Sequence, residues 1–356
     1  LIETTSLPFA DVAFAAGFAS VRQFNDTIRA VFAATPTRLR SDTARARGDS
    51  APAPGTVTLR LAYREPFDAE GLFGFLGARA VAGVESVSNG TYARAMRLPH
   101  GAATARVRPH GGHLDCTLRV ADLRDLGTAV ARLRRLFDAD ADPRAVDDVL
   151  AADPVLAPSV ARTPGIRVPG TVDGAETVLR ALLGQQVSVA SARTTTARLV
   201  RALGDPLDVP DGELTTLFPT PAVLALRGAE VLSGPRRKVA TIQEVSAALA
   251  EGRLDTHVGA DPDDLAATLE AFRGVGPWTS GYVRMRVLGE PDVLLDTDAA
   301  LRAGAVALGM SSRVDDLTAR AAAWRPWRSY AGMHLWRAAA TRPTPGSTSM
   351  SKRRTS

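Results

Sequence analysis

The stretch Leu269-Glu-Ala-Phe-Arg-Gly-Val-Gly-Pro-Trp278-Thr-Ser-Gly-Tyr282 predicts a helix, a tight Gly-Val-Gly hairpin and a second helix. Apolar residues keep helical spacing on both sides of the hairpin: Leu265, Leu269 and Phe272 before it, and Trp278, Tyr282 and Met285 after it. A short apolar run with a terminal carboxylate, Asp292-Val-Leu-Leu-Asp-Thr-Asp298, follows the second helix. The rest of the chain can be placed around these two segments.

The two glycines of the hairpin predict an anion-binding corner. We expect Gly274 and Gly276 to adopt positive φ and to leave backbone N–H groups bare, beside the N-terminus of a helix. Backbone N–H groups and a helix N-terminus together attract anions. Because the chain carries a net charge of +5, the anion expected here is a DNA phosphate.

A hairpin of this kind with a carboxylate about twenty residues later resembles the helix-hairpin-helix DNA glycosylases. Two further segments resemble the alkylation-repair branch, 3-methyladenine DNA glycosylase II: Ala181-Leu-Leu-Gly-Gln-Gln-Val-Ser-Val-Ala190 and Trp324-Arg-Pro-Trp-Arg-Ser-Tyr-Ala-Gly-Met-His-Leu-Trp336. The resemblance extends from about Val57 to about Ala340. It implies a mainly α fold, in which two helical halves flank a cleft and a small α+β domain precedes them.

Composition agrees with a soluble DNA-binding protein of two or three domains. The chain has 356 residues, and its positive charge is almost entirely arginine, since Lys238 and Lys352 are the only lysines. Cys116 is the only cysteine, so no disulfide or iron–sulfur cluster can form within one chain, and we expect a cytoplasmic protein. No apolar run predicts a membrane span or a signal peptide.

The N-terminal segment, residues 1–42, predicts a helix-turn-helix. Pro8-Phe-Ala-Asp-Val-Ala-Phe-Ala-Ala-Gly17-Phe18 and the following Val21-Arg-Gln-Phe24 resemble the second such unit of AraC-type regulators, as in adaptive-response fusion proteins. Ser20, Arg22, Gln23 and Asn25 would begin its recognition helix. We favour a remnant with little DNA affinity of its own. Residues 43–55, rich in Arg, Ser, Pro and Gly, predict a linker.

The remaining chain divides into three predicted parts. Residues 56–142 predict a small α+β domain, because alternating strands such as 57–63, 90–98 and 113–120 are interleaved with two amphipathic helices. Residues 143–340 predict helices only, including one that covers 174–203. Residues 341–356, rich in Ser, Thr, Pro and Arg, predict a disordered tail.

The resemblance implies Asp298 as the catalytic residue. In the family, the carboxylate after the hairpin faces the sugar of a flipped nucleotide and stabilises positive charge as the glycosidic bond breaks. Asp298 is also expected to cap the helix that follows, because Asp is favoured at that position. Asp296 is the rival within the same motif.

The resemblance also implies the reaction type and the base pocket. Glycosylase/lyases of this superfamily place a lysine at the position of Trp278, so here water is the expected nucleophile and no lyase activity is expected. The aromatic base pocket implied by the family matches Trp278, Tyr282, Trp336 and Phe75. Ala299 and Arg337 depart from the family's pattern, in which both positions are tyrosines, which leaves oxidised or deaminated bases as alternative substrates.

The DNA contacts implied by the resemblance lie in two segments. One side chain from Gln185-Gln186 is expected to fill the gap left by the flipped base, with Gln186 favoured and an exposed helix start as the alternative for Gln185. Gly274, Val275, Gly276 and Thr279 are expected to bind phosphates. Arg236, Arg237 and Lys238 predict either a phosphate contact or a solvated helix start.

No cofactor is required by this interpretation, although the resemblance allows a monovalent cation on the backbone carbonyls of Glu270, Phe272 and Val275. The implied function is a base-excision DNA glycosylase that releases alkylated purines such as 3-methyladenine and 7-methylguanine from double-stranded DNA, acting as a monomer. Two alternatives stay open: an AraC-type transcriptional regulator, and a sensor that binds alkylated DNA without cutting it.

Overall fold

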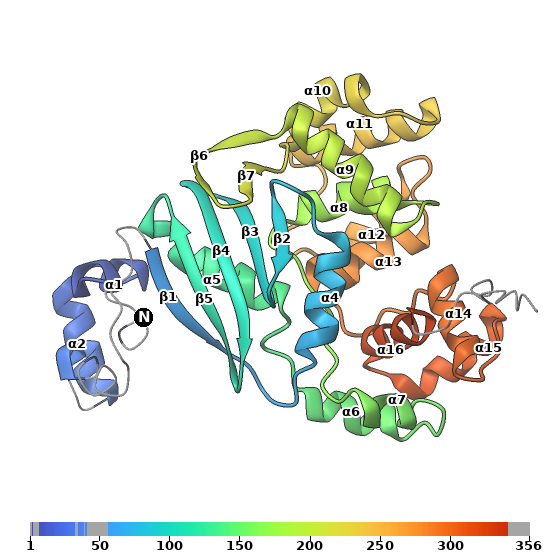
Figure 1. Cartoon of the computed structure of the whole chain (residues 1–356), viewed down its shortest axis with the longest axis horizontal. Helices are drawn as coiled ribbons and strands as arrows, with labels where there is room; N and C mark the ends of the chain where they lie inside the picture. Colours follow the sequence, from blue (N-terminus) through green and yellow to red (C-terminus); the bar gives the residue numbers. More distant parts are fainter. Residues whose placement is uncertain (1, 3–6, 33–34, 39, 41–55, 341–356) are drawn as a thin grey trace, which may run out of the picture.

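The computed structural model describes residue 2, residues 7–32, 35–38 and 40, and residues 56–340. Figure 1 shows two short helices at the left, a twisted sheet beside them, and the remaining helices gathered mainly to the right. The predicted linker over 43–55 and the predicted tail over 341–356 lie outside the described residues. The proposed division into domains therefore stays a prediction.

The N-terminal helices form a helix-turn-helix, α1 (Phe9–Ala15) and α2 (Val21–Phe32), with Gly17 in the turn at a φ of +82°. Val12, Ala13, Phe24 and Ile28 make its small core. Gln23 is used within the turn, since its backbone N–H donates to Ser20 Oγ and its side chain accepts from the Ala19 N–H. Two of the four expected recognition residues thus cap the helix instead of presenting their side chains freely.

A five-stranded antiparallel sheet follows, in the order β1-β5-β4-β3-β2. Its strands are β1 (Thr56–Ala62), β2 (Glu85–Ser88), β3 (Thr91–Leu98), β4 (Gly101–His110) and β5 (His113–Val120). Alternate residues of β1 are buried, as the period of a half-buried strand requires. The core beneath the sheet contains residues of α4 (Ala69–Arg79) and α5 (Leu126–Leu136). Figure 1 shows that α4 lies between the sheet and the helices on the right.

The prediction that only helices follow residue 143 is wrong. The strands β6 (Asp205–Asp211) and β7 (Leu214–Leu217) form a hairpin whose buried leucines pack against alanines of β3. Asp211 accepts from Arg106 of β4 at 2.9 Å, which fixes the hairpin on the sheet. Leu207 is the one buried residue of β6, which also contains two prolines, and the buried residues of β7, Leu214 and Leu217, lie three positions apart. Neither strand therefore has the apolar alternation that predicts a strand.

The helices form two groups, each with its own hydrophobic core. The first group comprises α8 (Gly174–Gly184), α9 (Val189–Leu203), α10 (Pro221–Val231), α11 (Arg236–Ala250), α12 (Pro262–Glu270) and α13 (Pro277–Val283). The second comprises α6 (Pro143–Ala151), α7 (Ala157–Arg162), α14 (Ala299–Ala307), α15 (Val314–Ala321) and α16 (Arg328–Ala340). These are the two helical halves of the predicted fold class. Among the described residues, no helix is both long and apolar enough to cross a membrane.

The single helix expected over 174–203 is broken into α8 and α9. Gln186 adopts a φ of +59°, which a continuing helix does not allow. Ser188 then caps α9, because its side chain accepts from the Ser191 N–H. The break creates a loop, residues 185–188, at the edge of the space between the two halves.

Candidate active site

A cavity of about 1050 Å³ lies where the two helical halves meet α4. Its lining includes residues of α4, α8, α9, α13, α14 and α16. Asp298, Trp278, Tyr282, Trp336 and Phe75 all line it, so the structure brings the expected catalytic carboxylate and the expected pocket aromatics together. Gln185, Gln186, Gly274, Gly276 and Thr279 line it as well.

Asp298 is held in place by three donors. It is the N-cap of α14, where Oδ1 accepts from the Leu301 N–H at 2.7 Å. The indole Nε1 of Trp336 donates to Oδ1 at 3.0 Å, and that of Trp278 donates to Oδ2 at 2.9 Å. These neutral donors and the helix N-terminus fix the carboxylate without neutralising it. Capping and facing the cavity are therefore compatible roles for one side chain.

Asp296, the rival carboxylate, points elsewhere. Its Oδ2 accepts from the hydroxyl of Thr318 at 3.2 Å, in an exposed contact. It is not among the described residues that line the cavity. The geometry therefore favours Asp298.

The aromatic residues form two stacked pairs. Trp278 and Tyr282 have ring centroids 5.4 Å apart and planes within 10° of each other. Phe75 reaches across from α4 to Trp336, with centroids 6.4 Å apart. Flat apolar surfaces of this kind suit a planar base.

The hairpin between α12 and α13 offers backbone N–H groups to solvent. Gly274 has a φ of +90°, as expected, but Gly276 has a φ of −128° and is extended, so the expected positive φ at Gly276 is wrong. Gly276 instead precedes Pro277 as the N-cap of α13. The N–H groups of Gly274 and Gly276 donate to no residue that the structure describes, and they remain available to an anion.

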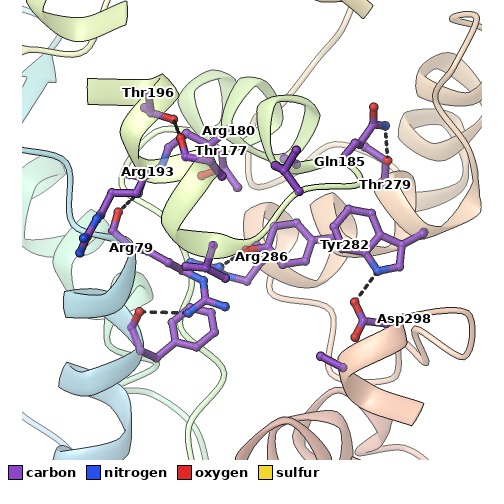
Figure 2. A pocket seen from close by; sticks show the side chains of 18 of the residues that line it. Arg79, Thr177, Arg180, Gln185, Arg193, Thr196, Thr279, Tyr282, Arg286 and Asp298 are labelled. Carbon is purple, nitrogen blue, oxygen red and sulfur yellow. Dashed lines mark hydrogen bonds between the residues drawn. The ribbon is translucent and has the colours of Figure 1, made fainter. Parts of the chain in front are cut away.

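Gln185 ties the loop at residues 185–188 to the hairpin. Its Nε2 donates to the Gly274 carbonyl at 3.1 Å. The same nitrogen donates to Thr279 Oγ1 at 2.9 Å (Figure 2). Lys238 secures the same loop from behind, since its Nζ donates to the carbonyls of Leu183 and Gln185. Within the basic cluster 236–238, Lys238 is thus part of the scaffold. Gln185 likewise contacts the protein itself, whereas it was expected either to fill a gap in DNA or to be exposed at a helix start.

Gln186 is exposed beside the cavity, and its neighbours add an apolar surface that the sequence analysis missed. Val187 and Val189 expose 45% and 41% of their surface. Large exposed apolar side chains next to a cavity indicate a contact surface. The signal in the sequence was the alternation Val-Ser-Val directly after the two glutamines.

Replacing Gln185 with Ala should lower the free energy of unfolding by about 1 kcal/mol, because two hydrogen bonds to the hairpin are lost. Gln186→Ala is the matched control, since Gln186 makes no hydrogen bond to a described residue and its change should stay within about 0.5 kcal/mol. Urea denaturation of both variants measures the difference. Equal changes would contradict the structural role of Gln185.

Arginines occupy the other end of the cavity, and the sequence analysis did not identify them. The guanidinium of Arg79 lies 3.6 Å from the centroid of Phe75, and that of Arg286 lies 5.1 Å from it. Arg286 also donates to the hydroxyl of Tyr282. Helical spacing places each arginine beside an aromatic residue, since Arg79 is four residues after Phe75 and Arg286 four after Tyr282, but it does not show that these faces line a cavity.

The two positions that depart from the family's pattern have different surroundings. Ala299 lines the cavity beside Asp298 and leaves room there. Arg337 is not among the described residues of this lining, and its Nη1 donates to Asp68 Oδ2 at 2.7 Å. Asp68 caps α4, so this ion pair links α16, which carries Trp336, to α4, which carries Phe75.

Comparisons with known proteins agree with this geometry. A family described as the AlkA N-terminal domain matches residues 58–173. A Mycobacterium tuberculosis protein named "Probable bifunctional transcriptional activator/DNA repair enzyme AlkA" is 49% identical over 337 residues, covering 94% of this chain and 68% of that protein. DNA-3-methyladenine glycosylase 2 of Escherichia coli K12 is 33% identical over 283 residues, covering 78% of this chain and 95% of that protein.

A solved structure confirms the fold. The 3-methyladenine DNA-glycosylase from Archaeoglobus fulgidus superimposes with a TM-score of 0.70 at 20% identity, covering 79% of this chain and 98% of that one. The two curated relatives have higher identity and are covered over most of their length. The chain therefore belongs to the AlkA family of DNA-3-methyladenine glycosylases.

Proposed function

We propose that this protein is a base-excision repair glycosylase that flips alkylated purines out of duplex DNA and hydrolyses their N-glycosidic bonds. The observation that carries the proposal is Asp298, an anionic side chain fixed by two indole N–H groups at the wall of an aromatic cavity. The names of the Escherichia coli and Mycobacterium tuberculosis relatives support a DNA repair role. A cavity that ends in an oriented carboxylate favours an enzyme over a sensor.

DNA would be held by the hairpin and the loop at residues 185–188. The available N–H groups of Gly274 and Gly276 would bind a backbone phosphate. Gln186, with the exposed Val187 beside it, would occupy the gap left by the flipped nucleotide and offset part of the cost of unstacking. Thr279 would act indirectly, since its hydroxyl is already bonded to Gln185.

Asp298 would act on the sugar of the flipped nucleotide. As the bond between C1′ and the base nitrogen breaks, its electron pair leaves with the base and positive charge develops on the sugar. The carboxylate of Asp298 would stabilise that charge and orient a water molecule toward C1′. The water oxygen forms the new bond to C1′, and the product is an abasic site.

Water is the proposed nucleophile because no lysine is among the described residues that line the cavity. Trp278 stands where a Schiff-base lysine would be needed, and its indole is bonded to Asp298. Lys238 lies behind the loop and donates to two carbonyls, which leaves it unsuited to attack a sugar. We therefore propose a monofunctional hydrolase.

A monovalent cation at the hairpin fits the residues present. The carbonyl oxygens of Glu270 and Val275 accept no hydrogen bond from the described residues, whereas that of Phe272 accepts from the Val275 N–H. Two available carbonyls near the negative end of α12 suit a cation. Such an ion would supply positive charge toward a DNA phosphate.

The test is base release from duplex DNA that carries 3-methyladenine and 7-methylguanine. We expect the purified protein to release both free bases, detected by chromatography, and to leave strands that break only after alkali treatment. Tight binding of methylated DNA without release would instead support a sensor. Strand cleavage without alkali would contradict the proposed reaction type.

A further inference from the structure

The cavity has opposite charges at its two ends. Figure 2 shows Asp298 at the right, Arg286 and Arg79 to the left, and Tyr282 between them. Trp278 joins the row next to Asp298, through its hydrogen bond to that carboxylate. A purine whose sugar faces Asp298 and which stacks on these rings would extend toward the arginines.

Neither of these two guanidinium charges is paired with a carboxylate. Arg79 and Arg286 have no carboxylate within 4.0 Å among the residues that the structure describes. Arg79 donates to the Phe75 carbonyl, and Arg286 donates to the carbonyls of Pro169 and Gly170 and to the Tyr282 hydroxyl. None of these neutral acceptors cancels a charge.

The neighbouring arginine of the cavity differs in this respect. The Nη1 of Arg180 donates to Glu85 and to Glu176, both at 2.8 Å. Its charge is thus balanced within the protein. The positive end of the cavity is therefore formed by Arg79 and Arg286. Arg79 belongs to α4, and Arg286 belongs to the π-helical turn Arg284–Leu288.

The directions of the pKa shifts at this end agree with a positive potential. Burial alone would raise the pKa of the Tyr282 phenol, but the charges of Arg286, Arg79 and Arg180 outweigh it and lower that pKa. Burial, together with the like charges of Arg286 and Arg180, lowers the pKa of Arg79. A negative charge is thus favoured there and an added positive charge is disfavoured.

Purine lesions differ in charge, and this decides how the positive end acts on them. A 7-methylguanine in DNA is cationic and leaves as a neutral base, so it needs no help with the departing electron pair. A hypoxanthine is neutral, and the pair from its C1′–N9 bond places negative charge on the base until a proton arrives. Guanidinium groups beside the base would stabilise that negative charge and would repel a cationic base.

We infer that Arg79 and Arg286 tune specificity in this glycosylase, raising its activity on uncharged purine lesions whose buried edge carries hydrogen-bond acceptors relative to its activity on cationic methylated purines. The inference rests on the proposed function, because it assigns substrate preference to the same cavity. In the hydrolysis of an uncharged lesion, the C1′–N9 bond breaks and the water oxygen bonds to C1′. The proton that the water loses is transferred to the departed base.

The experiment compares single-turnover release of hypoxanthine and of 7-methylguanine from otherwise identical duplexes by the full chain. Arg79→Met removes the charge but keeps an apolar stem, which can still pack against the Phe75 ring that the guanidinium covers. We expect the release of hypoxanthine to slow about tenfold relative to that of 7-methylguanine. Arg79→Lys, which keeps the charge, should retain the wild-type ratio.

Arg193→Met is the matched control, because Arg193 is exposed and lines the same cavity. It should slow both reactions by the same factor, as expected for lost attraction to DNA. An unchanged ratio in Arg79→Met, or the same ratio change in Arg79→Lys, would overturn the inference while leaving the proposed function intact. Release of neither base by the wild-type protein would refute the proposed function, and the inference with it.

Discussion

Asp298→Asn should reduce the single-turnover rate of base release from methylated duplex DNA by at least about 10²–10³-fold. The side chain keeps its size but loses the negative charge that faces the sugar. Positive charge that develops at C1′ would then meet a neutral amide instead of a carboxylate. The rate is measured with enzyme in excess over DNA, so that product release does not limit it.

The same substitution has a structural consequence that must be separated from the chemical one. The amide oxygen can still accept from the Leu301 N–H and from Trp336, as Oδ1 does in the carboxylate. The amide nitrogen then faces the indole N–H of Trp278, which leaves two donors together. We expect a loss of about 1–3 kcal/mol in the free energy of unfolding, which leaves the protein folded at 25 °C.

Asp296→Asn is the matched control for Asp298→Asn. It makes the same chemical change two residues earlier, at a side chain bonded only to the exposed Thr318. Its rate should stay within about twofold of wild type, since surface substitutions away from a site have small effects. Comparable losses in both variants would contradict the assignment. Loss in Asp296→Asn alone would transfer the catalytic role to Asp296.

Much of the candidate site could be predicted because its signals are local. The hairpin, its flanking helices and the carboxylate after it all lie between Pro262 and Asp298, and the resemblance identified the aromatics that line the cavity. Asp298 shows why a position can be predicted from local signals: a residue at a helix start is fixed by the backbone that follows it. Phe75 is distant in sequence and was placed by resemblance alone.

The missed features depend on tertiary contacts. Arg79 becomes a pocket residue only because α4 packs against the helical halves, and helical spacing does not show which face is covered. Gln185 was expected to be exposed or to contact DNA, but the hairpin carbonyl that it bonds lies 89 residues away. The strands β6 and β7 exist because the sheet offers them a surface, which overrides their weak intrinsic preference.

A buried charge network joins the sheet to the first helical half. Arg94 of β3 donates to Glu85 at 2.9 Å and also to Glu176 of α8, and these three side chains are 4–6% exposed. Arg180 of α8 donates to both glutamates and, through Nη2, to the Arg79 carbonyl of α4. The network thus fixes the helix that leads to the loop at 185–188 and the helix that carries Phe75.

Glu176→Gln should lower the free energy of unfolding by about 3–5 kcal/mol, because it leaves the buried Arg94 and the half-buried Arg180 to share one carboxylate. Burial would raise the pKa of Glu85, but Arg180 and Arg94 outweigh it and lower the pKa below 4.5, so the remaining carboxylate is charged at neutral pH. Glu85 therefore stabilises the fold above its unfolded pKa, and this contribution is lost as the pH falls through its folded pKa.

Urea denaturation at pH 7 measures the change in the free energy of unfolding that Glu176→Gln causes. Glu230→Gln, which breaks the exposed pair with Arg227, should cause no measurable change. A loss below about 1 kcal/mol in Glu176→Gln would mean that the network orients these helices without stabilising the fold.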